Sequence, residues 1–130
     1  AGLGLVHGFA ASAGGFFDIP HGVVCGTLVG AVTEETIKQL LENAPESPAL
    51  AKYAKAGAML AQEPSAGIET GCGLLVATIN EWVESLRIPR LGAYGVAESD
   101  FDRIIGGTGN KFNPAKIDEA GMRKILKKRL

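Results

Sequence analysis

Apolar residues recur at helical spacing along most of the chain, and no stretch shows sustained alternation of apolar and polar residues. Recurrence every three to four residues is typical of an amphipathic helix, whereas alternation is typical of a strand. The longest such pattern, about 68–87, carries Leu75, Ile79, Trp82, Val83 and Leu86. The sequence therefore predicts an all-α fold of six or seven helices joined by short loops.

Turn and capping residues divide this pattern into helices. The first, about 2–13, is apolar nearly all round, so we expect it to be buried on all sides and to end at Gly14-Gly15. A second begins near Pro20, and Thr33-Glu34-Glu35 predicts a restart, with an N-cap hydroxyl before two acids. The further helices are expected at about 50–61, at about 68–87, from Glu98 and at the end of the sequence, and Tyr53 and Trp82 are expected in the core.

Length and composition limit the class of protein. The 130 residues suggest one domain, 1–130, and a hydrophobic content of 46% with 21% charged residues is typical of a soluble globular chain. A net charge of -1 argues against a nucleic-acid or anionic-membrane partner, and two cysteines fit a cytoplasmic protein. The apolar run at the beginning is shorter than the ~20 residues of a membrane span. Because it opens within a core-like segment, we expect the chain to be part of a larger protein.

The two histidines, His7 and His21, are the strongest candidates for metal ligands, because a neutral imidazole is the commonest metal ligand in proteins. They are 14 positions apart, which would separate them by about 21 Å on one continuous helix. They can share an ion only if the chain folds back between them, with His7 inside one helix and His21 at the start of the next. By spacing alone, one structural and one capping histidine is the more common arrangement, and two histidines do not complete a catalytic site.

The string around the histidines carries further information. Residues 4–22 read GLVHGFAASAGGFFDIPHG, which resembles the signature of the iron-containing (group III) alcohol dehydrogenases, G-x-x-H-x-x-A-H-x-x-G-x-x-x-x-x-P-H-G. The glycines, both ligand positions and the terminal Pro-His-Gly agree. Ala11 departs from the pattern, because the family commonly has a second histidine there, which is not usually counted as a ligand. Weaker similarity continues through Leu86-Arg87-Ile88-Pro89-Arg90-Leu91 and from Asn113-Pro114 to the end.

The resemblance implies a two-domain enzyme, of which this chain is the all-helical, metal-binding C-terminal domain. It implies that His7 and His21 are two of four ligands to Fe²⁺ or Zn²⁺, with an Asp and a His on an upstream helix. It also implies NAD or NADP on an N-terminal domain, a small alcohol or aldehyde substrate and a homodimer or higher homo-oligomer. No catalytic residue beyond the ligands is expected within this chain, which alone should be inactive.

Other residues carry weaker signals. Phe16 and Phe17 are candidate walls of the substrate pocket, with core packing as the alternative. Cys25 lies one turn after His21 and could approach the site, although a buried small side chain is the more common role for such a cysteine. The sequence Gly106-Gly107-Thr108-Gly109 follows a helix rather than a strand, which argues against a phosphate-binding loop.

Two alternatives remain open. The first is a zinc enzyme of the same superfamily, similar to glycerol dehydrogenase or dehydroquinate synthase. The second is a non-catalytic helical module that docks an exposed apolar face on a partner.

Overall fold

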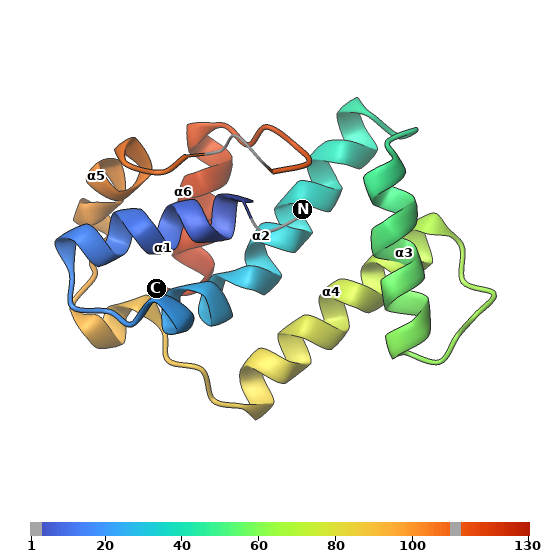
Figure 1. Cartoon of the computed structure of the whole chain (residues 1–130), viewed down its shortest axis with the longest axis horizontal. Helices are drawn as coiled ribbons and strands as arrows, with labels where there is room; N and C mark the ends of the chain where they lie inside the picture. Colours follow the sequence, from blue (N-terminus) through green and yellow to red (C-terminus); the bar gives the residue numbers. More distant parts are fainter. Residues whose placement is uncertain (1–3, 110–112) are drawn as a thin grey trace.

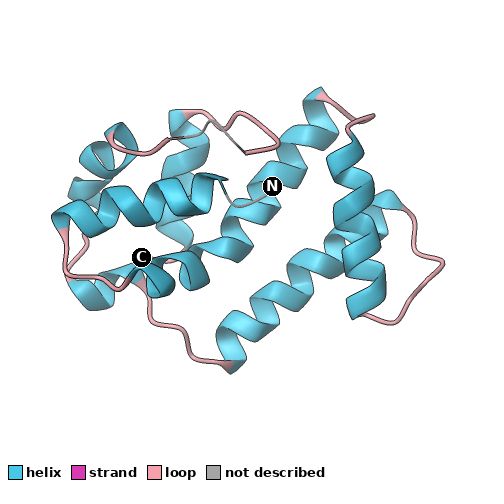
Figure 2. Ribbon diagram, viewed as in Figure 1, coloured by secondary structure: helices cyan, strands magenta, loops and turns pink. Residues whose placement is uncertain are grey.

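The computed structural model describes residues 4–109 and 113–130 of the chain. Within these ranges it consists of helices and loops, without a strand (Figures 1 and 2). The prediction of an all-α fold with six or seven helices is confirmed. The elements are α1 (Gly4–Phe16), α2 (His21–Asn43), α3 (Pro48–Leu60), α4 (Ile68–Ser85), the 3-10 helices η1 (Leu91–Tyr94) and η2 (Glu98–Asp100), α5 (Phe101–Gly106) and α6 (Glu119–Lys128).

Helix α1 differs from its prediction in two ways. It buries only one side, formed by Leu5, Val6, Phe9 and their neighbours, while His7 and Ala11 are exposed. It also continues through Gly14-Gly15, because the N–H of Phe17 still donates to the carbonyl of Ala13 at 2.9 Å. Glycine weakens a helix but does not end one whose neighbouring turns are packed. Positions 2 and 3 of the predicted helix lie outside the described residues.

Helix α2 runs without interruption through the predicted restart at Thr33. The Thr33 hydroxyl donates to the carbonyl of Val29 at 2.7 Å, one turn back. Such back-bonding lets a threonine sit inside a helix instead of capping a new one. The result is a single helix of 23 residues that extends through much of the molecule.

Helices α3 and α4 cross at a pair of glycines. A Cβ on Gly57 would overlap the carbonyl oxygen of Gly71, and a Cβ on Gly71 would lie 2.8 Å from the Cα of Ala54. Ser47 caps α3 by accepting from the N–H of Ala49 at 3.3 Å, and Pro48 occupies the first helical position. The high glycine content is therefore used, at this crossing, for close approach of two backbones.

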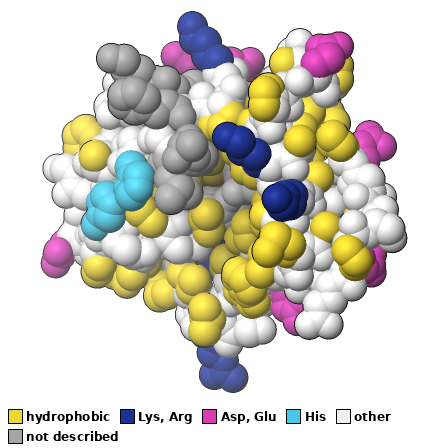
Figure 3. Space-filling model, turned by 45° about the vertical axis from the view of Figure 1, so that its right-hand side comes forward, with side chains coloured by type: hydrophobic (Ala, Val, Ile, Leu, Met, Phe, Trp, Pro, Cys, Tyr) yellow, Lys and Arg dark blue, Asp and Glu magenta, His cyan; other side chains and the backbone are white. Residues whose placement is uncertain are grey.

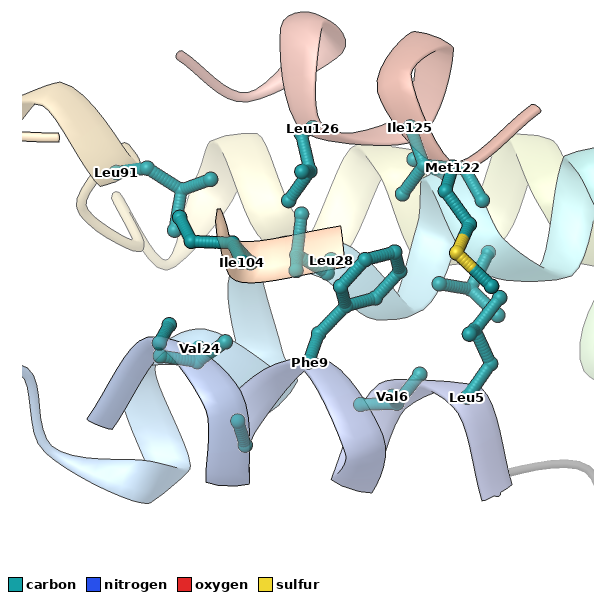
Figure 4. Close-up of a cluster of buried hydrophobic side chains, with 14 of the residues drawn as sticks. Leu5, Val6, Phe9, Val24, Leu28, Leu91, Ile104, Met122, Ile125 and Leu126 are labelled. Atoms are coloured by element: carbon teal, nitrogen blue, oxygen red, sulfur yellow. The ribbon is translucent and has the colours of Figure 1, made fainter. Parts of the chain in front are cut away.

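Two hydrophobic clusters form the core, and α2 contributes to both. The N-terminal half of α2 packs with α1, α5, α6 and Leu91, and Figure 4 shows Phe9 of α1 lying between Leu28 of α2 and the residues of α6. The C-terminal half of α2 packs with α3 and α4 through Ile37, Leu40, Leu50, Ala54 and Cys72. Helix α2 thus joins two groups of helices, which Figure 1 shows on either side of it.

The prediction that Trp82 lies in the core is wrong, because this side chain is 49% exposed and Leu86, on the same stripe, is 72% exposed. The C-terminal end of α4 extends beyond α3 (Figure 1) and packs on α2 through one side, where Val83 is buried and a Cβ on Gly30 would meet Asn80. Trp82, one position before Val83, lies outside that contact. Tyr53 is half-buried against the second cluster. No helix among the described residues is long and apolar enough to cross a membrane.

Candidate metal site

The two histidines meet on the surface where α1 and α2 form a hairpin. His7 lies on the exposed side of α1, and His21 is the first residue of α2. Residues 17–20 reverse the chain between them, ending in Pro20, whose extended backbone (φ -58°, ψ 137°) precedes the helix. The Nδ1 atom of His7 lies 3.2 Å from the Nε2 atom of His21. The predicted convergence is confirmed, and Figure 3 shows the two side chains adjacent on the surface.

The positions of the two imidazoles suit a shared metal ion. Their rings are stacked, with centroids 5.4 Å apart and planes inclined by 18°. Two nitrogens that each bind one ion at about 2.0–2.1 Å with tetrahedral angles lie about 3.3 Å apart. The observed 3.2 Å is close to that value. The same distance also allows one ring N–H to donate to the other ring, which requires no ion.

Cys25 is a third potential donor. Its Sγ atom lies 3.9 Å from Nδ1 of His7, and the ligand atoms of His7, His21 and Cys25 all lie within 4.8 Å of one another. Among residues 4–109 and 113–130, these three form the one group of at least three His, Cys, Asp or Glu side chains close enough to share an ion. Burial raises the pKa of the Cys25 thiol, and a backbone hydrogen bond acts in the opposite direction.

The prediction of a buried small side chain at Cys25 needs correction. The residue is only partly buried, and although it packs against the first cluster, its sulfur faces the histidines. A signal was present in the sequence, because residues four apart lie on the same side of a helix and Cys25 is four positions after His21. Cys72, in contrast, is buried and donates to the carbonyl of Leu50 at 3.5 Å.

Phe16 and Phe17 both lie next to a cation, and Phe17 also packs against the first hydrophobic cluster. The guanidinium of Arg103, on α5, lies 5.0 Å from the ring centre of Phe16 and 5.3 Å from that of Phe17. Along α1, Phe16 lies nine positions after His7, which corresponds to a rise of about 13.5 Å and about two and a half turns. The two residues therefore project on opposite sides of the helix.

The glycine-containing segment after α5 packs beside the site. A Cβ on Gly8 would overlap the carbonyl oxygen of Gly109 and would lie 3.2 Å from Thr108. This close approach places residues 108 and 109 against α1 at Gly8, which directly follows His7. The segment follows helix α5, so it lacks the preceding strand of a phosphate-binding loop; its continuation at 110–112 lies outside the described residues.

Two grooves on the surface of the described residues lie away from the histidines. A groove of about 700 Å³ runs between α2 and α4, with Leu41, Val76 and Asn80 in its lining. Another, of about 580 Å³, lies beside α3 and the loop that leads to α4. None of the lining residues of either groove belongs to the group around His7.

Comparison with known proteins assigns the chain to a family. The sequence model of a protein family described as "Fe-containing alcohol dehydrogenase family, C-terminal" matches residues 1–130. A solved structure titled "Crystal structure analysis of 1,3-propanediol oxidoreductase" is similar with a TM-score of 0.72 and 26% sequence identity. The similarity covers 98% of this chain and 32% of that chain, so this chain spans about a third of that relative. No curated protein matches. The chain thus belongs to the iron-containing alcohol dehydrogenase family, and it corresponds to the C-terminal, helical part of such proteins.

Proposed function

We propose that this chain is the metal-binding part of an NAD(P)-dependent alcohol dehydrogenase or aldehyde reductase, and that His7 and His21 are two of its metal ligands. The observation that carries the proposal is the 3.2 Å distance between their ring nitrogens, within a family match that covers the whole sequence. When bound, the divalent ion would act as a Lewis acid on the substrate oxygen and favour hydride transfer to or from the nicotinamide.

The two helices fix the ligands in place. Val24 and Leu28 of α2 pack with Leu5 and Phe9 of α1, so the hairpin that holds both imidazoles is part of the buried core. A metal site loses little conformational entropy on binding when its ligands are already held near their bound positions. Imidazole nitrogens bind both Fe²⁺ and Zn²⁺, so the proposal includes both ions.

The partners that we propose for the intact enzyme are those that the family suggests. The solved relative carries the name 1,3-propanediol oxidoreductase, and we propose a small primary alcohol or its aldehyde as the substrate here. NAD or NADP, a homodimer or higher homo-oligomer, and a cytoplasmic location are parts of the same proposal. Phe16 and Phe17 stay predicted pocket residues, which substitution by alanine in the intact enzyme would test through the KM for the alcohol.

Metal titration tests the two ligands directly. We expect the chain to bind one Zn²⁺ ion in a calorimetric titration. Loss of a residue that only holds a metal ligand in place typically weakens metal binding by roughly 10- to 100-fold. Loss of a ligand itself should weaken metal binding at least as much. The variants His7→Ala and His21→Ala should therefore each bind at least about tenfold more weakly.

Gly14→Ala on α1 is the matched control, because a Cβ there meets no atom within 4 Å. It should bind Zn²⁺ as tightly as the unaltered chain. If both histidine variants keep the affinity and stoichiometry of the unaltered chain, the metal-binding role of these residues is wrong.

A non-catalytic assembly role is the second candidate. The exposed side chains of Trp82 and Leu86 near the end of α4 favour it, because clustered apolar exposure often marks an interface. The substitutions Trp82→Ala and Leu86→Ala should then abolish self-association in light scattering. A monodisperse monomer of the unaltered chain would count against self-assembly.

A further inference from the structure

We propose that Cys25 donates its sulfur to the metal that His7 and His21 bind, so that this chain has a site with two nitrogen ligands and one sulfur ligand. The inference rests on the proposed function and deepens it by naming a third donor in the chain itself. It also predicts which metal ions the site prefers.

The placement of Cys25 follows from the helix that carries it. His21 and Cys25 are four residues apart on α2, and such residues lie on the same side of a helix. His7 approaches this side from α1, which brings its Nδ1 atom within 3.2 Å of His21 and within 3.9 Å of Cys25. The three donors therefore converge from two helices that the core holds together.

The distances are close to those of a mixed nitrogen and sulfur site. With a Zn–S bond of about 2.3 Å and a Zn–N bond of about 2.0–2.1 Å at tetrahedral angles, sulfur and nitrogen lie about 3.5 Å apart. The observed Sγ–Nδ1 distance is 3.9 Å. This distance exceeds the expected value by about 0.4 Å, and a rotation of the Cys25 side chain would bring the sulfur towards an ion held by both histidines, since all three ligand atoms lie within 4.8 Å of one another.

The chemistry of the donor set leads to a preference among ions. On binding, the sulfur–metal bond forms and the S–H proton leaves to solvent, because the thiolate is the ligand. Thiolate and imidazole ligands favour Zn²⁺ and Co²⁺, whereas Mg²⁺ and Mn²⁺ favour oxygen ligands. We therefore expect the chain to bind Co²⁺ and Zn²⁺ far more tightly than Mg²⁺ or Mn²⁺.

Cobalt provides the readout, because a Co²⁺–thiolate bond gives a charge-transfer absorption in the near ultraviolet that imidazole ligands do not. The 130-residue chain, kept reduced with a non-thiol reductant, is titrated with Co²⁺. We expect this band in the unaltered chain and in Cys72→Ser, the control for the second cysteine. Cys25→Ser should lose the band and bind Co²⁺ at least about tenfold more weakly, with an unchanged helical circular dichroism spectrum.

A second measurement needs no variant. Zn²⁺ should protect Cys25, but not the already buried Cys72, from alkylation by iodoacetamide, with the modified residues identified by mass spectrometry. Suppose that Co²⁺ binding depends on both histidines and yet shows no sulfur band, while Zn²⁺ leaves Cys25 open to alkylation. That combination overturns this inference and leaves the proposed function standing. A chain that binds no Co²⁺ or Zn²⁺, or binds them equally well without both histidines, overturns both.

Discussion

Ser12 is a single buried polar side chain that connects two helices distant in sequence. Its hydroxyl donates to the carbonyl of Ile104 at 2.6 Å, and only 7% of the residue is exposed. The Thr108 hydroxyl donates to the same carbonyl at 2.7 Å, so that oxygen keeps a partner if Ser12 is lost. We predict that Ser12→Ala lowers the free energy of unfolding by about 1 kcal/mol, measured by urea denaturation.

The exposed Ser99 offers the matched control, and Ser99→Ala should change the free energy of unfolding by no more than about 0.5 kcal/mol. Equal stability of Ser12→Ala and the unaltered chain would show that this contact between α1 and α5 contributes nothing.

Asp100 makes part of the stability depend on pH. Its Oδ2 atom accepts from the N–H of Ala97 at 2.8 Å, which, with the neighbouring Arg103, holds the pKa of the carboxyl below its ordinary value of 3.8. Since the pKa is lowered on folding, the stabilisation is complete above 3.8 and is lost as the pH falls through the lower, folded value. The stability difference between the unaltered chain and Asp100→Asn should therefore be constant near neutral pH and shrink in acid. Chemical denaturation at several pH values measures it, and a difference that does not vary with pH would contradict the role of Asp100.

Residue by residue, the sequence predicted the meeting of the two histidines better than their surroundings. The His7–His21 pair could be predicted because a signature and a plausible turn both pointed to it. The four-residue spacing from His21 indicates the side of α2 on which Cys25 lies, but the approach of its sulfur to His7 depends on where α1 meets α2, which the spacing does not show. The contact of Phe16 and Phe17 with Arg103 joins residues more than 80 positions apart, which periodicity cannot predict.

The crossing of α3 and α4 depends on glycine at the point of closest approach. A methyl group on Gly71 would lie 2.5 Å from the carbonyl oxygen of Ala54, so Gly71→Ala must separate the helices. Gly73, on the same helix, serves as the matched control, because a methyl group there would meet no atom within 4 Å. We predict that Gly71→Ala lowers the free energy of unfolding by at least about 2 kcal/mol. Gly73→Ala should raise it by about 0.5–1 kcal/mol, because alanine is the better helix former.

Thermal denaturation of the two variants provides the measurement. A similar melting temperature for both would mean that the helices can separate at little cost, and that the close crossing does not determine how α3 and α4 pack.

At the level of whole helices, the sequence predicted where helices exist better than where they end. The predicted break at Gly14-Gly15 and the restart at Thr33 are both wrong, because tertiary packing carries α1 and α2 through local signals that favour an end. The exposure of Trp82 has a related cause, since a helical stripe shows which side is apolar but not which part of that side meets a neighbour: Val83 is buried at the contact of α4 with α2, whereas Trp82 is not.

The molecule as a whole consists of two packed groups of helices that share α2. The candidate site lies at one end of that shared helix, on the hairpin with α1, and the second cluster lies along its other half. The all-α class could be predicted from periodicity, but the division into two clusters could not, because it depends on which helices pair. Since the chain spans about a third of the similar solved protein, the remaining ligands and the nucleotide site belong to the proposal for the intact enzyme.

Whether His7 and His21 hold one divalent ion can be decided by X-ray diffraction from crystals of the chain grown with Zn²⁺ and measured at the zinc absorption edge. We expect one strong anomalous peak about 2.0–2.2 Å from both Nδ1 of His7 and Nε2 of His21. A peak on only one of the two rings, or zinc bound elsewhere with none between them, would show that the pair does not share an ion.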